Sequence, residues 1–64
     1  MTIELTVKGM TCEGCEEVVE HALQMVDEVE SADADRYENL AIVEGDADRD
    51  ELIQKVELAG YEAE

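Results

Sequence analysis

Two cysteines separated by two residues are the part of this sequence with the clearest chemical potential. Cys12 and Cys15 stand in the segment GMTCEGC, residues 9–15. Two thiols at this spacing, where a loop runs into a helix, can converge on one point, and the positive end of the helix lowers thiol pKa values. The thiolate is the form that binds metals, and soft sulfur ligands select Cu(I), Zn(II) and similar ions. Gly9 and Gly14 are expected to give the loop backbone conformations that are closed to other residues.

A C-x-x-C pair is compatible with other chemistry as well. A structural zinc site needs four ligands, commonly two such pairs, whereas this chain has two cysteines and one histidine. His21 lies six residues after Cys15, roughly 240° around a helix, so we expect it to face solvent. A small dithiol redox protein is an alternative, although the chain is short for a thioredoxin fold and no Pro lies between the cysteines. No acid–base pair or activated hydroxyl points to other catalysis.

The elements around the cysteine pair follow from the spacing of apolar residues. Residues 2–8 alternate apolar and polar side chains, the period of a half-buried strand, and Gly9 ends the pattern. From Cys15 onward apolar residues recur on one helical stripe, with Thr11 or Glu13 as the expected cap. The stripe comprises Cys15, Val18, Val19, Ala22, Leu23 and Val26.

The second half of the chain predicts a hairpin and a second helix. A strand containing Val29, Ala32 and Ala34 is followed by a polar turn and by an apolar strand over residues 40–44. In that second strand Leu40 and Ile42 are expected to point to the open side of the sheet, away from the helices. The helix begins at a capping box formed by Asp48 and Glu51 and has the apolar stripe Leu52, Ile53, Val56 and Ala59.

Gly60 suits the carboxyl end of this second helix, and residues 61–64 leave room for one short final strand. Each helix has a single apolar face, so both are expected to cover the same side of one antiparallel sheet. The order strand, helix, strand, strand, helix, strand predicts an α+β two-layer sandwich of the ferredoxin-like type. We expect residues 1–64 to form a single domain.

Charge and composition exclude several classes of protein. Nineteen acidic residues against four basic ones give a net charge of −15, and the basic patch needed to bind nucleic acid is missing. No apolar run approaches the roughly 20 residues that cross a bilayer, and no signal peptide is visible, so a cytoplasmic protein is expected. The dispersed acid excess resembles the proteins of salt-accumulating haloarchaea, where salt screens self-repulsion. An ordinary acidic protein from a mesophile is the alternative.

The segment GMTCEGC, placed after a first strand and opening a first helix, resembles the heavy-metal-associated domain family. This family includes small copper metallochaperones and the N-terminal domains of copper-transporting P-type ATPases. The resemblance extends over essentially the whole chain, through VEHAL in the first helix, Ala41 and Val43 in the apolar strand, and the closing LAGYEAE. It implies a carrier, monomeric when apo, that binds Cu(I) through Cys12 and Cys15. The carrier would pass the ion by thiolate exchange to a copper-transporting P-type ATPase or another domain of the family.

The resemblance also assigns roles to residues around the pair. Met10 is expected to anchor the loop in the core, and Tyr61 to lie near the loop, either tuning the site or covering the core. Zinc-exporting members often have an acidic residue at the position of Thr11, so Thr11 favours Cu(I).

Some residues depart from the family pattern. Ala32 and Ala34 stand where bulkier aliphatic residues are usual, which predicts a thinner core. Leu58 is expected to contact the periphery of the core, with an exposed patch as the alternative. A cluster of acids is expected to oppose thiol ionisation and keeps open an oxygen-assisted Zn(II) site. A Zn(II) or Hg(II) carrier on the same fold is an alternative function. These acids are Glu13, Glu16 and Glu17.

Overall fold

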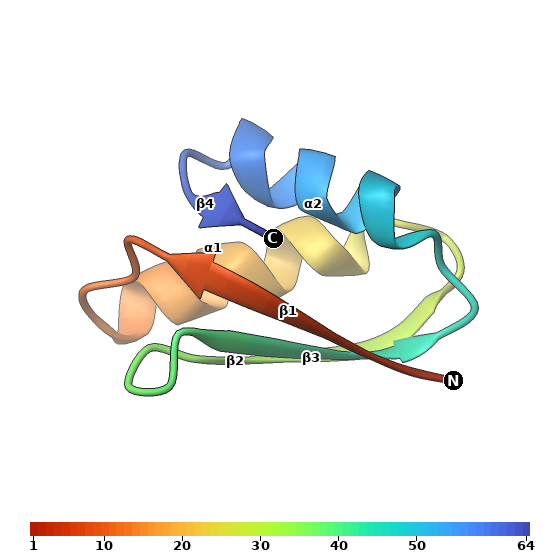
Figure 1. Ribbon diagram of the computed structural model, residues 1–64, viewed down its shortest axis with the longest axis horizontal. Helices are drawn as coiled ribbons and strands as arrows, with labels where there is room; N and C mark the ends of the chain where they lie inside the picture. The colour runs from red at the N-terminus through yellow and green to blue at the C-terminus, as the bar shows by residue number, and fades with distance from the viewer.

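The computed structural model describes residues 1–64 as a four-stranded antiparallel sheet with two helices on one face (Figure 1). Its elements are β1 (Thr2–Lys8), α1 (Glu13–Gln24), β2 (Val29–Asp35), β3 (Leu40–Gly45), α2 (Arg49–Leu58) and β4 (Glu62–Ala63). The strands lie in the order β2-β3-β1-β4. The predicted α+β sandwich and its element order are therefore confirmed. Neither helix is both long and apolar enough to cross a membrane.

The core lies between the helices and the inner face of β1 and β3. In β1 the alternation predicted from the sequence buries Leu5 and Val7 completely, and Leu5 lies opposite Ala41 of β3. Helix residues close over this face. The core residues that are fully shielded from solvent are Leu5, Val7, Val19, Leu23, Ala41, Val43, Leu52 and Val56. As expected, Ala32 and Ala34 of β2 add only small, half-buried side chains to this core.

The open face of the sheet has the apolar residues that the sequence placed there. Leu40 and Ile42 alternate with the buried Ala41 and Val43 along β3, so they point away from the helices. Both are half-buried and lie opposite Asp35 and Asp33 of β2.

The helix ends differ in how they are capped. Asp48 caps α2 as predicted, because its carboxylate accepts a hydrogen bond of 3.0 Å from the backbone N–H of Asp50. The return bond from Glu51 that would complete a capping box is not formed. The N-cap of α1 is Cys12, with extended backbone and no side-chain cap, so the expected caps Thr11 and Glu13 are wrong. Glu13 is already the first residue of the helix.

Two apolar residues are more exposed than the sequence suggested. Val18 is 46% exposed and Leu58 is 82% exposed. Val18 is one residue, about 100° of helix, from the buried Val19, and Leu58 is two residues, about 200°, from the buried Val56. The helical rotation therefore takes both side chains away from the core. The expected core contact of Leu58 is wrong, and the alternative, an exposed Leu58, is confirmed.

Candidate metal-binding site

The two thiols lie together where the loop after β1 enters α1. Both cysteines are free, Cys12 is exposed, and Cys15 is partly buried. Their Sγ atoms are 3.6 Å apart. A metal–thiolate bond is about 2.3 Å long, so two sulfurs within about 4.6 Å of each other can bind the same ion. The backbone carbonyl of Cys12 accepts from the N–H of Cys15 at 3.0 Å, which fixes the first helical turn beneath the pair.

The loop is held by the core on one side and by an aromatic ring on the other. Met10 is only 6% exposed and belongs to the core cluster, as the family resemblance implied. Gly9 has φ +101°, and a Cβ at this position would lie 3.4 Å from the Tyr61 ring. Gly9 therefore has the unusual backbone that the sequence suggested. Gly14 does not, because it lies inside α1 and has no positive φ.

Hydrogen bonds make Cys15 an unusually acidic thiol. The Tyr61 hydroxyl is the strongest influence, followed by Thr11 and then Cys12, and together they lower the pKa of Cys15 from 9.0 to about 6. The Thr11 Oγ1 lies 3.6 Å from the Cys15 Sγ. The same hydrogen bond to Cys15 raises the pKa of Tyr61. The structure thus brings Tyr61 to the loop, where the resemblance placed it.

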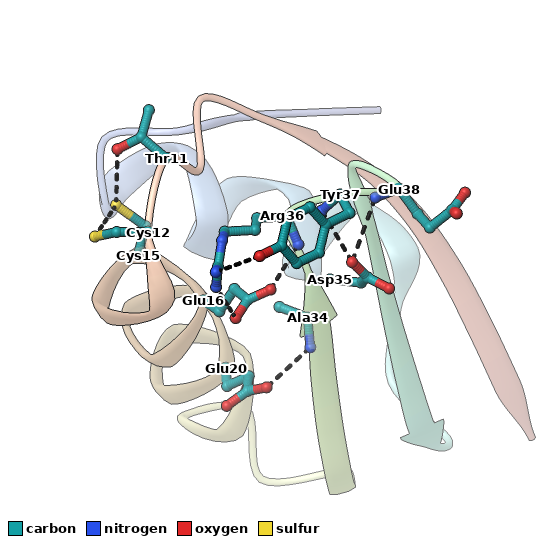
Figure 2. A network of polar contacts seen from close by, with 10 residues as sticks. All are labelled: Thr11, Cys12, Cys15, Glu16, Glu20, Ala34, Asp35, Arg36, Tyr37 and Glu38. Carbon is teal, nitrogen blue, oxygen red and sulfur yellow. Dashed lines mark hydrogen bonds and ion pairs between the residues drawn. The ribbon is translucent and has the colours of Figure 1, made fainter.

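The glutamates beside the cysteines do not act as the sequence suggested. They were expected to oppose thiol ionisation, yet the pKa of Cys15 is lowered because hydrogen bonds to its sulfur dominate. Glu13 and Glu17 are exposed. Glu16 is turned toward Arg36, whose guanidinium Nη1 lies 3.0 Å from its Oε1 (Figure 2).

No third metal ligand converges on the two sulfurs. The structure contains no group of three or more His, Cys, Asp or Glu side chains placed to hold one ion. His21 is exposed on α1, as predicted. The arrangement therefore offers two thiolates and an open approach, which suits a soft ion of low coordination number.

Sequence reasoning missed the contact between Arg36 and Glu16 beside this site. Arg36 lies 20 residues beyond Glu16 in the chain, so no local spacing connects them. The one available signal was its rarity, since the chain has only four basic residues among 64. The contact is visible only after the turn between β2 and β3 is placed beside the start of α1.

Comparison with known proteins agrees with this geometry. The family model for the heavy-metal-associated domain matches residues 4–62, so the chain belongs to this family. A copper-exporting P-type ATPase of Vibrio cholerae serotype O1 is 41% identical over 64 residues, which cover 98% of this chain and 7% of that protein. The chain thus spans less than a tenth of that relative's length.

Two solved structures are similar over nearly their whole length. A CopZ metallochaperone superposes with a TM-score of 0.95 at 30% identity, covering 100% of both chains. A copper-binding domain from HMA7, a P-type ATPase, gives a TM-score of 0.94 at 36% identity, covering 98% of this chain and 89% of that one. The fold of this chain is therefore the ferredoxin-like fold of heavy-metal-associated domains. Its relatives support a copper-binding role in metal transfer.

Proposed function

We propose that this chain binds one Cu(I) ion between Cys12 and Cys15 and passes it to a partner, acting as a carrier and not as an enzyme. The observation behind this proposal is the pair of free thiols 3.6 Å apart with no third ligand beside them. Two soft thiolates are sufficient for Cu(I), whereas structural Zn(II) sites have four ligands. The copper proteins among the relatives support copper as the cargo.

Transfer proceeds by ligand exchange. A thiolate of the partner adds to the low-coordinate ion, and one of the two original sulfurs then leaves. Cys12 is the exposed ligand, while Cys15 is partly buried and hydrogen-bonded to Tyr61 and Thr11. The partner's thiolate therefore approaches from the side of Cys12.

The proposed partner is a copper-transporting P-type ATPase or another heavy-metal-associated domain. The complex is transient and depends on the metal, because the shared ion links the two sets of thiolates. We propose that the apo protein is a monomer and that it works in the cytoplasm.

The ligand set is tested by substitution and by spectroscopy. A Cys15→Ser protein should lose most of its Cu(I) affinity in competition with a Cu(I) chelator, because one thiolate alone cannot hold the ion at a shared site. His21→Ala is the matched control and should bind as the unmodified protein does, since His21 is exposed. X-ray absorption of the Cu(I) form should show two sulfur neighbours. A Cys15→Ser protein with full Cu(I) affinity would contradict the proposal.

A dithiol redox protein is the second candidate, favoured by the acidic Cys15 thiol and the short distance between the sulfurs. Such a protein would reduce a protein disulfide and become oxidised to a Cys12–Cys15 disulfide. It would then turn over when an external thiol regenerates it. Catalytic turnover in this assay, with weak Cu(I) binding, would favour this candidate. A Hg(II) or Zn(II) cargo is tested by the same chelator competition with those ions.

A further inference from the structure

Glu16 is held by Arg36 through both of its carboxylate oxygens. Its Oε1 accepts from the guanidinium Nη1 at 3.0 Å, and its Oε2 accepts from the backbone N–H of Arg36 at 2.7 Å. The side chains of Arg36 and Glu16 are only 23% and 16% exposed. This ion pair is therefore far less open to water than an ordinary surface pair, whose contribution is small.

Arg36 is itself held in place by Tyr37. Its Nη2 donates to the Tyr37 hydroxyl at 2.6 Å, and its guanidinium carbon lies 4.5 Å from the centre of the Tyr37 ring. Burial alone would lower the pKa of Arg36, but Tyr37 and Glu16 raise it overall, so the guanidinium stays charged. Figure 2 shows the chain of contacts from Tyr37 through Arg36 to Glu16 beside the start of α1.

The restrained carboxylate lies next to the proposed metal ligands. Glu16 directly follows Cys15 in the first turn of α1, and Cys12 is the N-cap of the same helix, so the carboxylate and both thiols come from about one helical turn of chain. Zn(II) accepts carboxylate oxygen beside thiolate sulfur, whereas Cu(I) is selected by soft sulfur ligands. A free Glu16 would thus be within one helical turn of completing a site for the wrong ion.

We propose that Arg36 is a positioning residue that sets the metal preference of the site. By binding both oxygens of Glu16, it keeps a hard third ligand away from the thiol pair and so disfavours Zn(II) relative to Cu(I). The inference rests on the proposed function, because it concerns selectivity at the Cys12–Cys15 pair.

The test compares Zn(II) and Cu(I) affinities of variants by chelator competition. Arg36→Ala frees Oε1 of Glu16, although the backbone N–H of residue 36 still binds Oε2. Zn(II) affinity should rise about tenfold, the usual lower limit for changes at residues that orient metal ligands, while Cu(I) affinity should not change. X-ray absorption of the Zn(II) form should show an added oxygen neighbour. The second substitution in Arg36→Ala/Glu16→Gln should abolish both the gain in Zn(II) affinity and the oxygen neighbour.

Arg49→Ala is the matched control for charge. It removes the same single positive charge, but Arg49 donates to the Glu4 carbonyl at the far end of β1 and does not contact Glu16. Its Zn(II) affinity should stay at the original value. Arg36→Lys, which keeps the charge but cannot reproduce the guanidinium fork, should fall between the unmodified protein and Arg36→Ala. It also serves as the test if Arg36→Ala does not fold.

Three results would overturn the inference: no gain in Zn(II) affinity in either Arg36 variant, an equal gain in Arg49→Ala, or a gain that persists after Glu16→Gln. The failure of the proposed function looks different. In that case the unmodified protein would not bind Cu(I) through its two cysteines, whatever the Arg36 variants do with Zn(II).

Discussion

Cys15 acquires its acidity from hydrogen bonds and not from a neighbouring cation. The Tyr61 hydroxyl and Thr11 stabilise the thiolate, and they come from opposite ends of the chain. At neutral pH this sulfur is therefore largely ionised before any metal arrives. An ionised sulfur needs to release no proton when it binds an ion, which makes metal uptake less dependent on pH.

Tyr61→Phe tests the origin of this acidity. Loss of the hydroxyl should raise the pKa of Cys15 from about 6 toward 9.0, because the largest stabilising contact of the thiolate is removed. The pH dependence of thiolate absorbance or of alkylation rate measures the change. Tyr37→Phe is the control, since that 79% exposed ring contacts Arg36 and not the thiols. An unchanged pKa in Tyr61→Phe would assign the acidity to Thr11 and the backbone.

The same pKa shift predicts how the stability of the apo protein depends on pH. Cys15 titrates near pH 6 when folded and near 9.0 when unfolded, so between these values the unfolded chain binds more protons. The contribution of Cys15 ionisation to the free energy of unfolding is complete above about pH 9 and is lost as the pH falls through about 6. The free energy of unfolding, measured by denaturant titration from about pH 5 to about pH 9, should therefore rise with pH more steeply than in Cys15→Ser. Parallel profiles for the two proteins would contradict the shift.

At the scale of single elements, α2 offers a direct test of which helical positions form the core. Leu52 is fully buried and Leu58 is 82% exposed, although both are leucines of the same helix. Leu52→Ala should cost about 2–5 kcal/mol of stability through lost contacts and a cavity. Leu58→Gln should change stability by less than about 0.5 kcal/mol, as for other exposed positions. Denaturant unfolding measures both, and similar losses would mean that Leu58 packs in solution.

The elements were predictable because each has one apolar period. Alternation in residues 2–8 and the helical stripe around Val19 and Leu23 fixed which faces meet, and burial follows those faces closely. The exact ends of the helices and the edges of their apolar faces were harder to predict from the sequence. Periodicity could not show that Cys12 is the N-cap of α1, or that the side chain of Val18 points outward. Caps and flanking positions depend on the path of the loop, which apolar spacing does not encode.

The site was predictable to a similar degree. The cysteine spacing and its place before a helix pointed to the thiol pair, and the family resemblance pointed to Met10 and Tyr61. The contact between Glu16 and Arg36 could not be predicted from the sequence, because it joins a helix to a turn 20 residues further along the chain. Such pairings depend on how packed elements bring side chains together, and a single sequence has no local pattern for them.

At the scale of the whole molecule, charge is the dominant feature. The net charge of −15 on 64 residues already includes the four basic residues, and only two of these form ion pairs, Lys8 with Glu64 and Arg36 with Glu16. A core of this size supplies about 3–5 kcal/mol, so repulsion among the carboxylates acts against a small total stability. Molar KCl should therefore raise the thermal midpoint substantially, since it shortens the screening length to about 3 Å. Equal midpoints at about 0.05 M and about 2 M KCl would show that repulsion does not limit this fold.

The carboxylates of α1 have a consequence for how these molecules meet one another. β2 is an outermost strand of the sheet, and such strands offer unpaired backbone groups on which a strand of another molecule can assemble. Two outward N–H groups at this edge are already occupied: that of Ala34 in β2 donates to Glu20 at 2.9 Å, and that of Arg36, directly after the strand, donates to Glu16. An incoming strand would have to displace both carboxylates and approach their negative charge. The helix that presents the thiols thus also protects the sheet against strand-to-strand aggregation.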